Sequence, residues 1–192
     1  MSRHTAVDNE KELCRRIKSH DKTAIKKLYT TYIGYLSAVC FRYITDDDDA
    51  KDVLQDCFIK IITKFPQFEY RGEGSLKAWM IRILINEAID FIKNKEKDRI
   101  LEYNSEIPDT GEEQEPNVED VPTDVIHNMI KNLSVGYRTV FNLYVFENKS
   151  HKQIAEILDI KESSSASQYL RAKRLLAKWI NNYRKTGKED YR

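Results

Sequence analysis

Glycine and proline are scarce in this chain, which contains 6 glycines and 4 prolines among 192 residues. Because the tight turns of β-rich proteins depend on these two residue types, their scarcity argues against an all-β fold. No apolar run approaches the roughly 18 residues that a membrane span needs. The N-terminal segment also lacks the apolar core of a secretion signal. We therefore expect a cytoplasmic protein without membrane insertion.

Metal-binding and catalytic patterns are missing as well. The three cysteines, Cys14, Cys40 and Cys57, are an odd number and lie far apart, so no C-x-x-C pair exists. We expect reduced thiols that fill helix faces. The histidines are scattered, and no paired carboxylates, cysteine–histidine arrangement or phosphate-binding loop stands out. The sequence therefore predicts no metal site, no cofactor and no enzymatic activity.

The small net charge of +1 conceals a strong segregation of charge along the chain. From Glu102 to Asp124 every charged residue is acidic, whereas from Arg171 onward basic residues dominate. A basic end is typical of a segment that meets phosphates, and an acidic run is typical of a segment that stays solvated. The pattern suggests a nucleic-acid-binding C-terminus that follows an acidic linker.

Apolar residues recur at helical spacing on both sides of that acidic run. Longer helices are predicted within 10–44, after the aspartates 46–49, and over 75–97, and shorter ones within 124–183. Residues 100–122 contain prolines and acids in place of an apolar pattern. We predict an all-α fold with two helical domains, 1–98 and 124–192, joined by a flexible acidic linker, 99–123.

The C-terminal domain has the outline of a helix-turn-helix. Ser150 is predicted to cap a short helix, and a longer basic helix begins near Ser163 after a turn. Hydroxyl, amide and cationic groups at the start of such a helix can contact bases and phosphates. These groups are Ser163, Ser164, Ser165, Ser167, Gln168, Arg171, Lys173 and Arg174. The alternative is a polar cap on an amphipathic helix with a solvated basic face.

Two segments of the N-terminal domain also contain combinations of side chains that are typical of binding sites. Tyr70, Arg71, Trp79 and Arg82 bring aromatic rings and cations together near a glycine-containing loop, as in proteins that hold unpaired bases. Trp79 can equally be a core residue. Residues 49–58 have one apolar face and one acidic and amide face. That second face is either a docking surface or an ordinary solvated one.

Taken in order, these segments resemble the extracytoplasmic-function (ECF) sigma factors of bacteria. Residues 49–58, DAKDVLQDCF, are similar to the family's D-A-E-D-x-x-Q-E/D-x-F, with Lys51 in place of an acid. In the family this helix docks on the clamp of the largest RNA polymerase subunit. The resemblance therefore implies a core polymerase-binding role for Asp49, Asp52, Gln55, Asp56 and Phe58.

Residues 70–93, YRGEGSLKAWMIRILINEAIDFIK, resemble the family's promoter-melting segment, with Lys93 in place of an arginine. The resemblance implies that this segment captures a flipped base of the minus-10 element. The residues concerned are Tyr70, Arg71, Gly72, Glu73, Gly74, Ser75, Arg82, Asn86 and Lys93. We predict that Asn86 and the loop 70–75 form one pocket for that base, with Arg82 and Lys93 near the backbone.

The C-terminal domain is similar to the family's minus-35 reader over RTVFNL (138–143), QIAEIL (153–158) and RAK (171–173). Here residues 164–167 read SSAS where the family usually has T-V-K-S, so Ser165 replaces an apolar anchor and Ala166 a cation. The resemblance implies that the Ser163–Arg174 groups named above bind minus-35 duplex.

The function implied is that of a sigma factor, which is not an enzyme. Its expected partners are core RNA polymerase, promoter DNA and an anti-sigma factor. The alternative is a helix-turn-helix regulator that binds duplex without polymerase, which would leave 49–58 and the loop 70–75 unexplained. The promoter sequence and the inducing signal are not encoded in any recognisable pattern.

Overall fold

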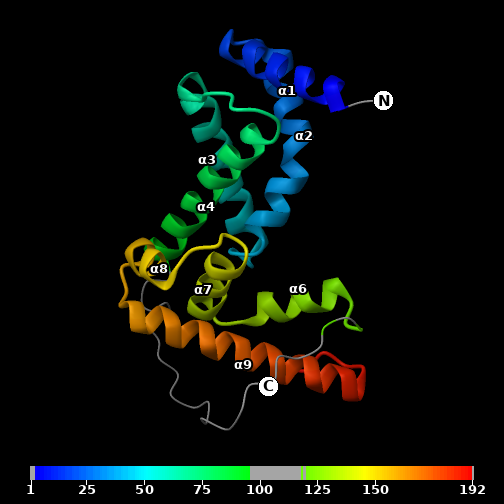
Figure 1. Ribbon diagram of the computed structural model, residues 1–192, viewed down its shortest axis with the longest axis vertical. Helices are drawn as coiled ribbons and strands as arrows, with labels where there is room; N and C mark the ends of the chain where they lie inside the picture. The colour runs from blue at the N-terminus through cyan, green and yellow to red at the C-terminus, as the bar shows by residue number, and fades with distance from the viewer. Residues whose placement is uncertain (1–2, 96–117, 119, 192) are drawn as a thin grey trace. The chain divides into compact units, whose positions relative to one another are not determined.

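A computed structural model describes residues 3–95, 118 and 120–191 (Figure 1). The regular structure in these ranges is entirely helical, which confirms the predicted all-α class. Contacts divide the chain into two compact units, Met1–Phe91 and Ile92–Arg192. Of the predicted linker 99–123, Val118 and residues 120–123 are described, and the remainder lies outside the described residues. The domain boundaries at 98 and 124 therefore stay a prediction.

Two helices of the N-terminal unit begin directly after a capping aspartate. Its elements are α1 (Arg3–Lys18), α2 (Lys22–Cys40), α3 (Asp47–Lys64), the short 3-10 helix η1 (Phe65–Gln67) and α4 (Ser75–Lys95). The Asp21 carboxylate accepts backbone N–H groups at the start of α2, and Asp46 does the same for α3. The predicted cap within 46–49 is thereby confirmed. Helix α3 ends at Lys64, two residues before Pro66.

Apolar side chains from each helix fill the interior of this unit. Helices α2, α3 and α4 contribute fully buried residues, and α1 adds Leu13, Cys14 and Ile17 on its inner side. The fully buried residues of α2, α3 and α4 include Leu28, Leu36, Ile61, Leu76, Met80 and Leu84. Lys60 of α3 and Glu87 of α4 form an ion pair that links these two helices. As expected, all three cysteines are buried.

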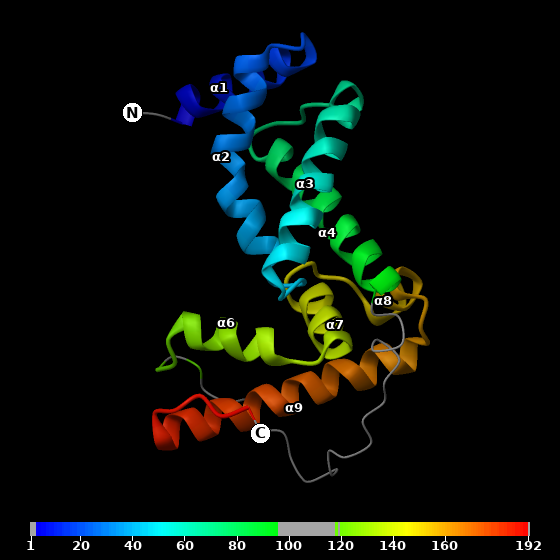
Figure 2. The ribbon, with the colours of Figure 1, turned by 180° about the vertical axis from the view of Figure 1, so that it is seen from behind.

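The C-terminal unit is organised around one long helix. Its elements are α6 (Thr123–Asn132), α7 (Val135–Val145), α8 (His151–Leu158) and α9 (Glu162–Thr186). Helix α9 contacts each of the other three, as Figure 2 shows. Buried Met129, Tyr137, Leu176 and Trp179 belong to the apolar core along α9. Ser150 forms a capping box with Gln153 at the start of α8, which confirms the predicted cap.

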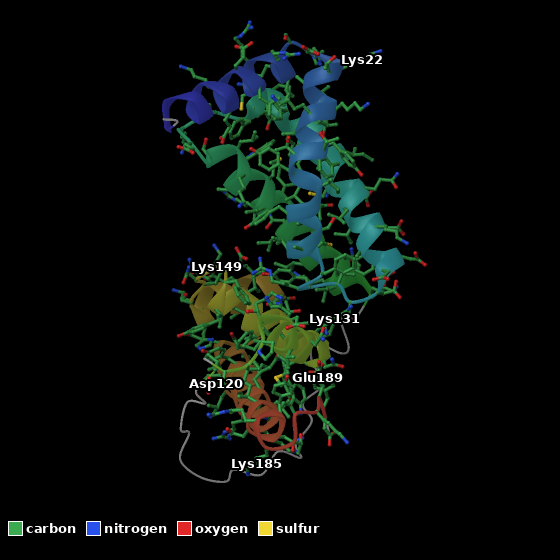
Figure 3. The ribbon with its side chains drawn as sticks, turned by 90° about the vertical axis from the view of Figure 1, so that its right-hand side faces the viewer. Lys22, Asp120, Lys131, Lys149, Lys185 and Glu189 are labelled. Atoms are coloured by element: carbon green, nitrogen blue, oxygen red, sulfur yellow. The ribbon has the colours of Figure 1, made fainter. Side chains whose placement is uncertain are left out.

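Polar contacts hold the ends of this unit together. The buried Arg138 guanidinium donates to the carbonyl oxygens of Leu133 and Lys131, at 2.8 and 3.1 Å, and so satisfies the C-terminus of α6. Asp120, labelled in Figure 3, forms an ion pair with Arg184 of α9 at 3.7 Å. Glu189, also labelled there, accepts from Asn128 of α6 at 3.4 Å.

The described residues contain neither a candidate membrane span nor a candidate metal site. Among them, no helix combines the length and the hydropathy required to cross a membrane. The same part of the chain holds no group of three or more His, Cys, Asp and Glu side chains placed to bind a metal ion.

Candidate nucleic-acid and partner interfaces

The outward side of α3 carries the charged residues predicted for docking. Asp52, Gln55 and Asp56 are exposed, while Asp49 is half-buried. Ala50, Val53, Cys57 and Ile61 are buried on the opposite side of the helix. The spacing of three and four residues explains this division, since it repeats one helix face. The structure therefore brings Asp52, Gln55 and Asp56 together on one solvent-facing surface.

Two apolar residues beside this surface were not predicted from the sequence. Ile59 is 54% exposed and lies four residues after Gln55, hence on the same face. Tyr29 of α2 is 49% exposed, and its ring packs against Phe58 at a tilt of 54°, with centroids 4.8 Å apart. Phe58 is half-buried in that contact, so it both packs and borders the surface. We call Tyr29, Asp52, Gln55, Asp56, Phe58 and Ile59 the α3 surface.

The loop 70–75 has a closed, glycine-dependent shape. Gly72 and Gly74 have φ angles of +117° and +81°, a region that side chains disfavour. The Ser75 hydroxyl donates to the Gly72 carbonyl at 2.6 Å and accepts from the Arg71 N–H at 3.2 Å. Ser75 is thus the first residue of α4 and closes the loop. Arg71 and Glu73 point into solvent, and Arg71 pairs with Glu69.

Helix α4 presents further predicted residues along one side. Arg82 and Asn86 are exposed and Lys93 is half-buried, and spacings of four and seven residues place them on a common face. Ser75 shares this face, because seven residues separate it from Arg82. Asn86 lies about three turns beyond Ser75, or roughly 16 Å along the helix axis. No single base spans that distance, so Ser75 and Asn86 do not meet at one base. The prediction that Asn86 and the loop 70–75 as a whole form one pocket stays a prediction.

Trp79 lies between the loop and Asn86. Its ring meets Phe65 edge-on at 5.7 Å and lies 4.9 Å from Phe68. The indole is half-buried, and Phe65 and Phe68 beneath it are buried. Trp79 therefore packs against core residues, in agreement with its possible core role, while part of its side chain stays exposed.

Helix α9 separates the predicted minus-35 residues into an outer and an inner set. Ser163 is exposed, and Ser164, Ser167, Arg171, Lys173 and Arg174 are half-buried. Ser165 and Gln168 are buried, with 0% and 4% exposure, so their predicted base contacts are corrected here. Both lie in phase with Ala172 and Leu176 of the apolar stripe. That phase was the signal in the sequence that would have placed them inside.

The buried Ser165 has a defined partner in the preceding helix. Its hydroxyl lies 3.0 Å from Nδ1 of His151, the first residue of α8. The His151 ring stacks on Tyr144, with centroids 4.7 Å apart, and Tyr144 in turn lies 4.3 Å from Tyr169 of α9. A polar contact inside an aromatic cluster thus joins α8 to α9 where the family has an apolar anchor.

Two cations of α9 rest against aromatic groups of this unit. The Arg171 guanidinium donates to the Tyr137 hydroxyl at 3.5 Å, and Lys173 Nζ lies 6.0 Å from the Tyr169 ring centroid. Such contacts orient the stems of the side chains while the charge stays accessible. Ser163, Ser167 and Arg174 lie on the side of α9 opposite its buried stripe.

Comparison with known proteins gives consistent matches for both units. A model of Sigma-70 region 2 matches residues 28–98, and a model of Sigma-70, region 4 matches residues 123–176. An ECF RNA polymerase sigma-E factor of Haemophilus influenzae is 27% identical over 182 residues, covering 87% of this chain and 93% of its own. An RNA polymerase sigma-H factor of Pseudomonas aeruginosa is 24% identical, covering 89% and 93%.

Two solved structures are also similar to this chain. One is CnrH in complex with the cytosolic domain of CnrY, at 17% identity and a TM-score of 0.47, covering 88% of this chain and 96% of that one. Another is the sigma factor RpoE in complex with the anti-sigma factor NepR from Bartonella quintana, at 20% identity and a TM-score of 0.47, covering 82% and 96%.

Proposed function

This chain belongs to the ECF branch of the sigma-70 family, and on that premise we propose how it works as an RNA polymerase sigma factor. It binds core RNA polymerase, directs it to promoters and promotes opening of the DNA strands. The observation that carries the proposal is the order of the two family matches, each on a unit with a solvent-facing set of binding residues. The mechanism is binding, so we propose that the chain is not an enzyme and acts in the cytoplasm.

The α3 surface is the proposed site of docking on core polymerase. It combines the carboxylates of Asp52 and Asp56 with the exposed Ile59 and Tyr29. An apolar centre bordered by charge is typical of a protein–protein contact, where burial supplies affinity and charge supplies specificity. Gln55 adds an amide that can both donate and accept. Lys51, which pairs with Asp48 at 2.8 Å, departs from the family's acid at this position.

The minus-10 strand is proposed to run along one face of the N-terminal unit. The loop 70–75 receives one unstacked base, and its two glycines let the backbone approach that base closely. Further along α4, Asn86 offers a donor and an acceptor to a second position of the strand. Arg82 lies between these two subsites and Lys93 lies beyond Asn86, where their charges attract the backbone phosphates. The separation of roughly 16 Å between Ser75 and Asn86 along α4 supports two subsites over a single one.

The minus-35 duplex is proposed to contact the outer face of α9. Ser163, Ser164 and Ser167 lie at the start of the helix, which is the part that enters the major groove in helix-turn-helix proteins. Arg171, Lys173 and Arg174 follow within about two turns and supply phosphate or guanine contacts. Ser165 and Gln168 support this face from inside and make no base contact.

An anti-sigma factor is the third proposed partner. A protein that covers the α3 surface or the outer face of α9 would block the chain from polymerase or DNA. The solved complex of the sigma factor RpoE with the anti-sigma factor NepR from Bartonella quintana supports such a partner by analogy. The inducing signal and the identity of this partner are separate questions from the function itself.

Transcription from a purified system tests the proposal. Core RNA polymerase with this chain should produce a run-off transcript of defined length from a promoter fragment, and core polymerase alone should not. The alternative, a helix-turn-helix regulator, predicts duplex binding by the chain without core and no transcript when it is added to core. A chain that binds duplex but never confers initiation on any of its genomic promoters would favour that alternative.

A further inference from the structure

The start of α4 lacks the local cap that neighbouring helices have. Helices α2 and α3 are capped by the side chains of Asp21 and Asp46, which immediately precede them. The residue before α4 is Gly74, which has no side chain to offer. The first N–H groups of any helix have no partner within that helix, so they need an acceptor from elsewhere. At α4 that acceptor comes from a distant part of the chain.

The acceptor is the carboxylate of Glu10 in α1. Its Oε2 accepts the Gly74 N–H and its Oε1 accepts the Leu76 N–H, each at 3.2 Å. In Figures 1 and 2 the segment that joins η1 to α4 runs toward the end of the unit where α1 crosses α2. The buried Leu13, Cys14 and Ile17 anchor α1 to the unit and so fix the position of Glu10. Helix α1 precedes the family match, which begins at residue 28.

We propose that Glu10 is a positioning residue for the minus-10 loop. One carboxylate holds the backbone on both sides of Ser75, the residue that closes the loop by its own hydrogen bonds to Gly72 and Arg71. Because Gly72 and Gly74 leave the loop intrinsically free, this contact selects one loop shape before DNA arrives. The inference rests on the proposed function, and it extends the minus-10 reader to α1.

The test compares Glu10→Ala and Glu10→Gln with Glu12→Ala in the full chain bound to core polymerase. Glu12 is a matched control, since it lies on the same helix, carries the same charge and pairs with exposed Arg15 instead. Glu10→Ala should open an intact promoter about ten-fold less, while Glu12→Ala behaves as wild type. Glu10→Gln keeps one acceptor oxygen and should be intermediate. If Glu10→Ala is poorly folded, Glu10→Gln still tests the role of the Glu10 carboxylate.

Two further readouts separate positioning from a general loss of structure. Hydrogen exchange at the Gly74 and Leu76 amides should accelerate in Glu10→Ala, with the amides of α2 and α3 unchanged. Binding of single-stranded minus-10 oligonucleotides that differ at one base should become less selective. A uniform loss of binding with unchanged selectivity would overturn the positioning role. Stronger opening by Glu10→Ala would also overturn it, because Glu10 would then be a competitor of DNA.

Variants of Glu10 and Asn86, measured together, distinguish an error in the positioning role of Glu10 from an error in the proposed function. If Glu10→Ala opens the promoter as wild type does while Asn86→Ala does not, Glu10 has no positioning role and the sigma function stands. If variants of Glu10, the loop and Asn86 all open the promoter normally, the minus-10 site itself is wrongly placed, and the inference is overturned with it.

Discussion

At the scale of one residue, Ser165 is a polar residue that was predicted to contact DNA but that lies in the core. Its hydroxyl contacts His151 Nδ1 inside the aromatic cluster of Tyr144 and Tyr169. The sequence placed it in a serine-rich run, where every member looked equally available to DNA. The helical phase set by Ala172 and Leu176 distinguishes it from Ser163 and Ser167. A buried hydroxyl of this kind contributes to stability and to helix orientation.

Replacing Ser165 should therefore lower stability. Ser165→Ala leaves the partly buried His151 nitrogen without its partner, which costs about 1–2 kcal/mol of the free energy of unfolding. Urea denaturation of the full chain measures this change. Ser163→Ala is the control, because Ser163 is exposed and should change stability by less than about 0.5 kcal/mol. Equal stability of the two variants would show that the His151–Ser165 contact is unimportant.

The cysteines make a residue-scale prediction about pH. Burial raises the pKa of Cys14 to about 11 and the pKa values of Cys40 and Cys57 to about 12, from an ordinary value of 9.0. A thiol whose folded pKa is raised stabilises the fold fully below pH 9, and that contribution is lost as pH rises toward 11 or 12. The free energy of unfolding should fall above pH 9.

Cys40→Ala isolates this effect from other titrating groups. Between pH 9 and 11 the variant should lose stability less steeply than wild type, although it is less stable at neutral pH because it leaves a small cavity. Urea denaturation at a series of pH values gives both curves. Parallel curves for the two proteins would mean that the Cys40 thiol does not titrate differently on unfolding.

Elements were predictable from the sequence where their signals are local. The aspartates before α3 and Ser150 before α8 act within a few residues of the helix start, so they could be identified without the structure. The cap of α4 could not, because Glu10 and Gly74 are far apart in the chain. The separation of Ser75 and Asn86 could be derived from the predicted helix 75–97, since eleven residues span about three turns.

The α3 surface gives a prediction at the scale of one element. Asp52→Lys and Ile59→Lys should each weaken binding to core polymerase by at least about ten-fold, because each places a charge where a complementary contact is proposed. Neither residue is buried, so the fold should persist. Asp124→Lys, an equal charge reversal on exposed α6, serves as the control. Affinity for core that is unchanged in both variants would remove α3 from the docking site.

At the scale of the whole molecule, the cations that are proposed to contact DNA are distributed over both units. The chain as a whole is nearly neutral, with a net charge of +1, so affinity for DNA depends on where the cations lie. Arg171, Lys173 and Arg174 lie in the first half of α9, whereas Arg82 lies in the first half of α4 and Lys93 in its last turn. The family resemblance correctly predicted which helices carry these groups. Their burial, and the helix faces on which they lie, could be determined only from the structure.

Salt dependence tests the duplex-binding part of this division. Arg174→Ala should weaken binding of the holoenzyme to all minus-35 sequences alike, and it should lower the slope of log affinity against log salt by about one unit. Lys185→Ala removes the same charge near the other end of α9, labelled in Figure 3, and should leave the slope nearly unchanged. An identical slope for wild type and Arg174→Ala would place Arg174 outside the DNA contact.

Strand opening at an intact promoter tests the central claim most directly. Permanganate reactivity of unpaired thymines around minus-10 should be compared for core polymerase bound to wild type, Asn86→Ala and Asn94→Ala. Asn94 is exposed on the same helix outside the proposed face, so it controls for the loss of an amide. Asn86→Ala should bind core and closed duplex normally, open the duplex about ten-fold less, and regain part of its transcription on a premelted template. Opening of the intact duplex by Asn86→Ala at the wild-type level would contradict the account.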